Sequence, residues 1–338
     1  SDGNVAIRFL YRQRENATLT PKGHLLGFDQ IVLSEGAPAA NRFRELSPAR
    51  MESPLSYRED DRDIIISGGN FRYVYNKHHA VFNEMVFENR TILTKPMEYN
   101  IWRAPTDNDS NIAREWKKAS FDRTVTRAYE TQVSENDKEI VIKSILSISA
   151  VHIQRILDIE AQWTVSADGI VKVKLDVKRD PEFPGLPRFG LRVFLPNEVE
   201  QVEYFGYGPN ESYMDKRRSS WLSRFDSTVS ALHENYLKPQ ENGSHFGCRY
   251  ALLSDGETAL FVSSPDTFSF NASHYTQEEL GGKRHAYELE ESGHTVCCLD
   301  YKQYGIGSNS CGPITLQQYR FEELAFTFHL ELAPIKLK

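Results

Sequence analysis

Three observations predict that this chain folds as an all-β protein, a large two-sheet antiparallel β-sandwich. Apolar and polar residues alternate with a period of two along most of the chain, which is typical of strands with one buried face. Stretches with helical periodicity are scarce, and no internal repeat is present. The 338 residues are enough to bury a large core between two sheets.

Strands are expected where this alternation is clearest. In chain order these segments are Ile64–Ile66, Phe71–Asn76, Ile140–Ile148, Ile153–Val165, Ile170–Val177, Leu191–Leu195, Tyr250–Leu253, Ala259–Val262, Thr295–Tyr301 and Phe321–Leu332. Asp168 and Gly169 separate two long strands of this series, and an Asp-Gly pair in that position favours a tight hairpin turn. A further strand pair is expected near the start, at Arg8–Arg12 and Gly27–Leu33.

One helix is clearly indicated, at Asn111–Ala119. Ile112 and Trp116 lie four residues apart there and share a helix face, and Asp109–Ser110 can cap the first turn. A second, weaker helix is expected within Ser219–Tyr236.

The chain divides at residues 36–55, a segment that contains three prolines and several small residues and is predicted to be a linker. Residues 1–35 form too few strands for an independent domain, because isolated strand pairs are marginal in water. They are therefore expected to be the last strands of a domain that begins upstream. Residues 56–338 are expected to form the sandwich.

Composition excludes several classes of partner. The net charge is −7 and the pI about 5.9, so no basic field is present to attract nucleic acid or an anionic membrane surface. No apolar run approaches the length of a membrane span. The four cysteines and ten histidines show no metal-ligand spacing, so no metal site is expected in this chain.

The segment Trp102–Asp109, called the octet below, is the most informative in the sequence. It combines an aromatic, a cation, a rigid turn and short polar acceptors in Trp102, Arg103, Pro105, Asp107, Asn108 and Asp109. Asp and Asn side chains bond nearby backbone groups and favour turns and helix starts. The octet therefore predicts a strand end that leads into a capped helix, with its aspartates in capping rather than catalytic roles.

The octet also closely resembles a signature of the C-terminal β-sandwich domain of glycoside hydrolase family 2 β-galactosidases. Further segments resemble the same family in the same order, namely Phe205–Tyr213, Pro239–Gly243, Phe268–Asn271, Tyr275–Leu280 and Gly305–Gly307. The resemblance runs through nearly the whole chain. It implies a supersandwich of the galactose-mutarotase type, preceded in residues 1–35 by the final strands of an immunoglobulin-like domain.

In the family that the chain resembles, hydrolysis of terminal non-reducing β-D-galactose residues occurs elsewhere. The two catalytic glutamates and the magnesium and sodium sites lie on a separate (β/α)8 barrel, which this sequence lacks. The resemblance therefore implies a non-catalytic portion with no cofactor of its own. This portion is expected to support the barrel of the same polypeptide, to contribute an active-site loop, and to help assemble a homo-oligomer in the bacterial cytoplasm or periplasm.

The expected active-site loop follows Gly305–Gly307. In well-known members a tryptophan after this segment stacks on the substrate, and the matching residue here is Cys311. A thiol cannot supply the broad face of an indole, so the resemblance implies weaker recognition of the glucose moiety of lactose. Ser308, Asn309 and Ser310 are the expected polar contacts of this loop.

A second interpretation is a stand-alone carbohydrate-binding or aldose-mutarotase-like sandwich. Glu211 and Glu241 each follow Asn or Gln in a turn-like setting, where each can act as a general acid or as a loop brace. A mutarotase-like centre needs a glutamate and a histidine that converge in a groove. Glu241 with His245 or His274 are the candidates for that pair.

Overall fold

The computed structural model describes residues 4–47, 54–136 and 138–337. The chain separates into two compact units, Ser1–Leu46 and Ser47–Lys338. Each unit has its own pattern of strand pairing, and the two are described one after the other.

The first unit is a two-stranded antiparallel ribbon followed by a helix. β1 (Val5–Arg12) pairs with β2 (Leu25–Ser34), as the sequence predicts for this region. α1 (Pro38–Leu46) occupies much of the segment predicted to be a linker. Proline is compatible with a helix at its first position, where no backbone N–H is needed, so the proline content of this segment did not exclude a helix. Residues 48–53 of the same segment lie outside the described part of the chain.

The second unit contains a twelve-stranded sheet in which every pairing is antiparallel. Along its main path the strands are β15 (Trp221–Thr228), β14 (Gln201–Gly208), β16 (Ser244–Ser254), β17 (Thr258–Ser273), β19 (Ala325–Lys336), β12 (Val171–Arg179), β11 (Arg155–Ser166), β10 (Glu139–Ala150) and β9 (Thr124–Glu135). A branch leaves β17 through β18 (His294–Gln303) to β13 (Arg188–Pro196) and β8 (Lys95–Asn100).

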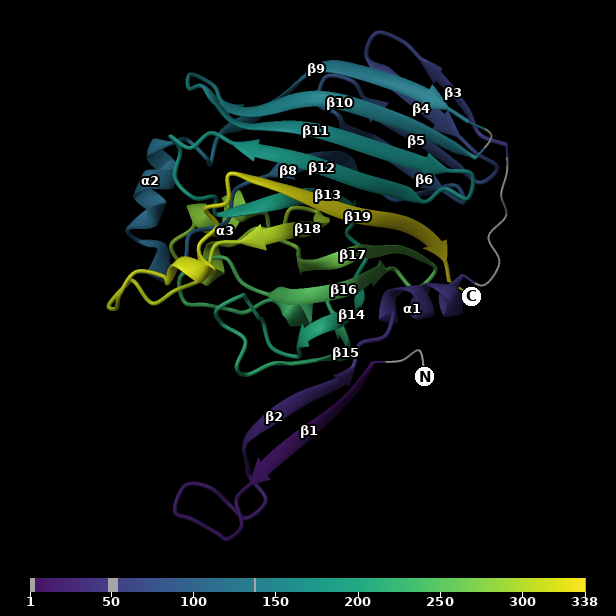
Figure 1. Ribbon diagram of the computed structural model, residues 1–338. Coiled ribbons are helices and arrows are strands. Elements are labelled where there is room, and N and C mark those ends of the chain that lie inside the picture. Colours follow the sequence, from purple (N-terminus) through teal and green to yellow (C-terminus); the bar gives the residue numbers. More distant parts are fainter. Residues whose placement is uncertain (1–3, 48–53, 137, 338) are drawn as a thin grey trace. The chain divides into compact units, whose positions relative to one another are not determined.

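A five-stranded antiparallel sheet forms part of the second layer, behind β9–β12 in Figure 1. Its strands are β3 (Ser56–Glu59), β4 (Asp63–Ser67), β5 (Phe71–Asn76), β6 (Val81–Phe87) and β7 (Arg90–Thr91). Trp163 on β11 packs edge-on against Tyr75 and Phe82, with ring centroids 6.1 and 5.4 Å apart. The hydroxyl of Tyr73 donates a 2.8 Å hydrogen bond to the carbonyl of Gly169, so the two layers are fixed by polar as well as apolar contacts.

The branch strands complete the second layer at the other end of the core. Phe189 on β13 packs against Phe326 on β19 with a centroid distance of 5.1 Å, and Tyr301 on β18 stacks on the same ring at 4.5 Å. β17 connects the layers, because Thr258–Ser263 pairs with β19 while Ser269–Ser273 pairs with β18. The predicted all-β, two-layer antiparallel sandwich is thus confirmed.

The predicted hairpin turn is also confirmed, since Gly169 lies between β11 and β12 with a φ of +81°, a value that favours glycine. The last predicted strand starts later than expected, at Ala325. The helix α2 (Ile112–Lys118) forms where it was predicted and buries Trp116.

The helix expected within Ser219–Tyr236 is wrong, because β15 and a 3-10 turn occupy that segment. The apolar residues there have helix-like spacing, but pairing with β14 overrides it, as the contact of Phe225 with Tyr204 at 5.3 Å illustrates. The remaining short helices are η1 (Asp107–Asp109), η2 (Ser230–Leu232), α3 (Gln277–Gly282), η3 (Ala286–Glu288) and η4 (Gln317–Tyr319). None of the helices in the described ranges is long and apolar enough to cross a membrane.

Candidate functional site

The octet leaves β8 and turns into the short helix η1. Asp109 at the end of this turn accepts a 2.9 Å hydrogen bond from the backbone N–H of Thr106 and so caps η1. The expected capping of the following helix by Asp109 or Ser110 is wrong, because Asn111 is the N-cap residue of α2 and no side-chain capping bond forms there. Asp107 is exposed and pairs with Lys238 at 3.3 Å. Pro105 is half-buried within the turn, and Trp102 is 7% exposed.

Arg103 joins the octet to a segment two hundred residues later in the chain. Its guanidinium is completely buried and donates two hydrogen bonds to Asp109, from Nη2 at 2.6 Å and from Nε at 3.2 Å. It also donates to the carbonyls of Tyr304 and Gly305. Because a buried charge needs partners on every side, this one arginine fixes both segments.

The loop 306–313 is held at its base by further polar contacts. The side-chain amide of Asn108 donates a 2.7 Å hydrogen bond to the carbonyl of Gly307, and Ser310 donates to Asn108 Oδ1 at 2.9 Å. The carboxylate of Asp215 accepts from the backbone N–H groups of Ile306 and Gly307 at 2.9 and 2.8 Å. The base of the loop is therefore anchored to the octet and to a third segment.

The outer part of the loop carries the residues that the sequence predicts to meet substrate. Ser308, Ser310 and Cys311 are exposed, and Asn309 is half-buried. Cys311 is a free thiol, and its sulfur lies 3.6 Å from the hydroxyl of Ser310. These side chains are thus presented outward from an anchored base.

Glu241 also supports the octet, through contacts with the backbone of Ala104. Its backbone N–H donates to the carbonyl of Ala104 at 3.0 Å, and its Oε2 accepts from the N–H of Ala104 at 3.2 Å. Its Oε1 accepts a 2.7 Å hydrogen bond from Arg188, which also donates two bonds to Asp300. All three charged side chains are almost completely buried, so Glu241 is committed to this network.

Burial governs the electrostatics of this network. It raises the pKa of Glu241 and of Asp300, although the neighbouring Arg188 opposes the rise. Burial also disfavours the charged form of Arg188, but the two carboxylates outweigh this effect and its pKa lies well above the ordinary value. The network is a cation held between two carboxylates in the protein interior.

Glu211 belongs to a separate polar cluster. Its carboxylate accepts hydrogen bonds from Lys216 and Tyr236, and from the backbone N–H of Gly243 at 3.0 Å. Burial opposes ionisation, but the bonds from Lys216 and Tyr236 outweigh it and hold the pKa of Glu211 below its ordinary value. Glu211 is therefore ionised at neutral pH.

The two histidines of the mutarotase-like interpretation lie in different surroundings. His245 is buried and packs against the rings of Tyr204 and Phe270, with centroids 4.3 and 5.3 Å away, and burial lowers its pKa to about 4. His274 lies 2.9 Å from the carboxylate of Glu200 through its Nε2. No hydrogen bond joins either imidazole to Glu241 in the described part of the chain.

Sequence reasoning missed Arg188, Asp300 and Asp215, which hold the site together. No local pattern marks them, because each acts on residues that are distant in the sequence. Among residues 4–47, 54–136 and 138–337, no group of three or more His, Cys, Asp or Glu side chains is arranged to hold a metal ion.

Comparison with known proteins identifies the family. The family model described as beta galactosidase small chain matches residues 67–332. A β-galactosidase of Actinobacillus pleuropneumoniae is 41% identical over 95% of this chain and 31% of its own length. A β-galactosidase of Staphylococcus xylosus is 36% identical over 90% of this chain and 31% of its own length. The chain thus spans about a third of the length of these curated relatives.

Sugar epimerases are among the solved structures that match this chain. A galactose 1-epimerase from Lactobacillus acidophilus NCFM matches with a TM-score of 0.46 and 10% identity, over 85% of this chain and all of that one. A putative aldose 1-epimerase from Escherichia coli K12 matches with a TM-score of 0.43, over 84% of this chain and all of that one. The match over residues 67–332 shows that the chain belongs to the β-galactosidase small chain family.

Proposed function

We propose that this chain is the non-catalytic, C-terminal portion of a β-galactosidase that hydrolyses terminal non-reducing β-D-galactose residues with retention. Family membership and the partial coverage of the relatives support this proposal. The remaining polypeptide supplies the catalytic barrel with its carboxylate pair and its magnesium and sodium sites. The parent enzyme assembles as a homo-oligomer.

The proposal also assigns a structural role to each segment of the chain. Residues 1–35 are the last strands of an immunoglobulin-like domain, residues 36–55 connect it to the next domain, and residues 56–338 form the sandwich that supports the barrel. The exposed apolar side chains of β1 and β2, such as Ile7 at 44% and Ile31 at 53%, are then covered by the upstream strands of that domain.

The observation that carries the proposal is the anchored loop. A retaining glycosidase needs two carboxyl groups about 5–5.5 Å apart that are free to act on the substrate. Here Glu241 is committed to Arg188, and Glu211 to Lys216 and Tyr236. The 306–313 loop instead has a rigid base and an exposed outer part, which suits a loop that completes a site on another domain.

In this proposal Ser308, Asn309 and Ser310 make polar contacts with the substrate or brace the loop. Cys311 takes the place of an aromatic stacking residue. A sulfur atom covers far less apolar surface than an indole, so the enzyme binds the glucose moiety of lactose weakly and prefers other aglycones.

A graft tests the proposal. The 338-residue chain replaces the corresponding segment of the Actinobacillus pleuropneumoniae β-galactosidase, to which it is 41% identical. The chimera is expected to hydrolyse a chromogenic galactoside, and removal of the 306–313 loop is expected to abolish this activity while the chimera stays folded. Full activity of the loopless chimera would contradict the proposed role of the loop.

The mutarotase-like alternative predicts a different result. The isolated chain would then interconvert the anomers of galactose, and Glu241→Gln would abolish that activity. We expect that neither the isolated chain nor its Glu241→Gln variant catalyses this interconversion. Polarimetry on freshly dissolved α-galactose distinguishes the two interpretations.

A further inference from the structure

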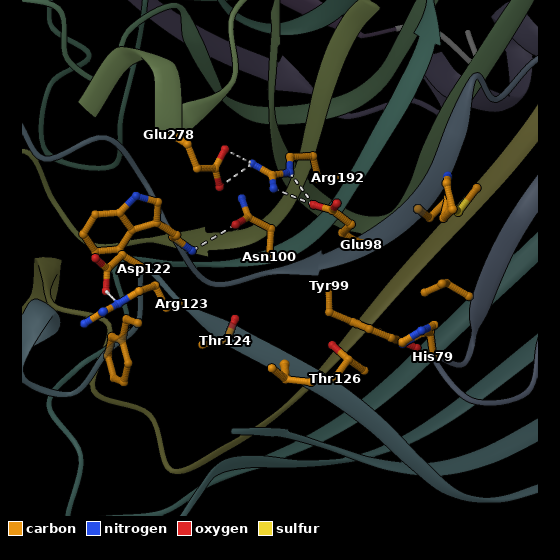
Figure 2. A pocket seen from close by; sticks show the side chains of 16 residues that line it. His79, Glu98, Tyr99, Asn100, Asp122, Arg123, Thr124, Thr126, Arg192 and Glu278 are labelled. Atoms are coloured by element: carbon orange, nitrogen blue, oxygen red, sulfur yellow. Dashed lines mark hydrogen bonds and ion pairs between the residues drawn. The ribbon is translucent and has the colours of Figure 1, made fainter. Parts of the chain in front are cut away.

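A pocket of about 460 Å³ opens beside the octet, and no residue of the 306–313 loop lines it. Its walls come from β8, from the start of β9, from Arg192 on β13 and from Glu278 on α3 (Figure 2). The volume lies within the range of about 300–1,000 Å³ that is typical of small-molecule sites.

On one wall of the pocket, an arginine holds two carboxylates in place. Figure 2 shows Arg192 between Glu98 and Glu278, to which its Nε and Nη1 donate hydrogen bonds of 2.8 Å each. Nη1 also donates to Gln277 at 3.0 Å. The side chains of Glu98 and Glu278 are nonetheless 46% and 50% exposed, so both carboxylates remain able to accept hydrogen bonds from a ligand.

Further donors and acceptors line the pocket. Nε of Arg123 and Oδ1 of Asp122 lie 3.7 Å apart, and this Oδ1 is buried without a hydrogen-bond partner among the described residues. The hydroxyl groups of Thr124 and Thr126 add groups that can both donate and accept. Asn100 is 5% exposed, and among the described residues its Nδ2 donates only to the weak acceptor Cys298 Sγ, at 3.8 Å.

The lining also includes His79 and several apolar or aromatic residues, namely Val81, Pro96, Met97, Tyr99, Trp102, Phe121 and Val125. A ligand that fits this pocket therefore needs one apolar face and several groups that donate and accept hydrogen bonds. A strongly charged ligand fits poorly, because both signs of charge occur in the lining. A sugar ring has the required combination, since its C–H face is apolar and each hydroxyl group both donates and accepts.

We propose that this pocket binds a neutral mono- or disaccharide, at a site separate from the 306–313 loop. Glu98 and Glu278 accept from the sugar hydroxyls, and Arg123 donates to them. The proposal adds a binding site to the chain and does not depend on the catalytic role of the parent enzyme.

Binding is measured on the full 338-residue chain by isothermal titration calorimetry. The probes are galactose, glucose and lactose, with inorganic phosphate and free lysine as charged comparisons. Arg123→Ala and Glu278→Gln each remove one polar contact of the pocket. Arg114→Ala and Glu115→Gln are the matched controls, because both residues are exposed on α2 and neither lines the pocket.

At least one sugar is expected to bind saturably, and each pocket variant is expected to weaken that binding by about tenfold. The two controls leave it unchanged, and circular dichroism shows all four variants folded. The proposal is overturned if no sugar binds, if the pocket variants bind as the wild type does, or if phosphate or lysine binds better than any sugar.

Two further results separate this inference from the proposed function. Loss of sugar binding in Asn309→Ala, with binding retained in the pocket variants, would assign the sugar to the loop and overturn the pocket proposal. The galactosidase activity of the chimera is measured independently, so either proposal can fail without the other.

Discussion

The side chain of Asn108 donates a 2.7 Å hydrogen bond to the carbonyl of Gly307, 199 residues further along the chain. Through this bond a short turn after β8 supports the base of an exposed loop. Arg103, five residues earlier, supports the same region through the carbonyls of Tyr304 and Gly305. The octet is thus a platform for the loop.

The first prediction concerns the Asn108 bond. Asn108→Ala in the chimera is expected to lower kcat/KM for a chromogenic galactoside by about fivefold, because one neutral hydrogen bond contributes about 1 kcal/mol. Asn111→Ala is the control, since the side chain of Asn111 makes no capping hydrogen bond. Equal activity of the two variants would show that the bond does not position the loop.

The second prediction concerns the buried ion pair. Arg103→Met leaves Asp109 buried without its partner, so the free energy of unfolding is expected to fall by about 3–5 kcal/mol in urea titrations of the isolated chain. Lys238→Met breaks an exposed pair with Asp107, whose two side chains are 58% and 61% exposed, and is expected to cost less than about 1 kcal/mol. Similar losses in both variants would contradict the structural role of Arg103.

The third prediction is a pH dependence. The pKa of Glu211 in the folded chain lies below the ordinary value of 4.5, so the folded state binds fewer protons than the unfolded state. The stability that Glu211 contributes is therefore present above pH 4.5 and is lost as the pH falls through its lowered pKa. Glu211→Gln is expected to be less stable than the wild type at pH 7, and the difference is expected to shrink toward pH 3.

Urea unfolding between pH 7 and pH 3 measures this difference. Glu135→Gln is the control, because Glu135 is exposed at the end of β9. A gap between wild type and Glu211→Gln that stays constant with pH would show that the carboxylate charge does not stabilise the fold.

The fourth prediction concerns substrate recognition. Cys311→Trp in the chimera is expected to lower the KM for lactose several-fold, because an indole restores a broad apolar face at the aglycone position. Ile314→Trp adds the same ring to another exposed position of the loop region and is expected to leave the KM unchanged. An unchanged lactose KM in Cys311→Trp would remove Cys311 from the list of substrate contacts.

The sequence predicted the strands whose buried faces alternate regularly. Ile140–Ile148 and Ile170–Val177 are examples, because both cross the core and every second side chain is buried. β9 gave no such signal, since it lies at the edge of the sheet and most of its side chains are half-buried or exposed. Period-two alternation arises where one face of a strand is buried, and an edge strand buries few of its side chains.

The same distinction applies to the site. The turn of the octet follows from its own residues, because Asp109 bonds a backbone group three positions away. The bracing of the octet by Glu241 does not, because Arg188, which holds Glu241, meets Asp300 only through the pairing of β13 with β18. Asp215 likewise reaches Ile306 across 91 positions of sequence. Such contacts depend on strand register, which local patterns do not encode.

The central claim is that these sheets support a galactoside-cleaving centre whose catalytic carboxylates belong to another part of the polypeptide. Its most direct test is turnover of a chromogenic galactoside by the purified 338-residue chain, measured beside the chimera at equal molar concentration. We expect hydrolysis by the chimera and none by the chain alone. Sustained turnover by the chain alone, in a preparation shown by mass spectrometry to be free of barrel polypeptide, would contradict it.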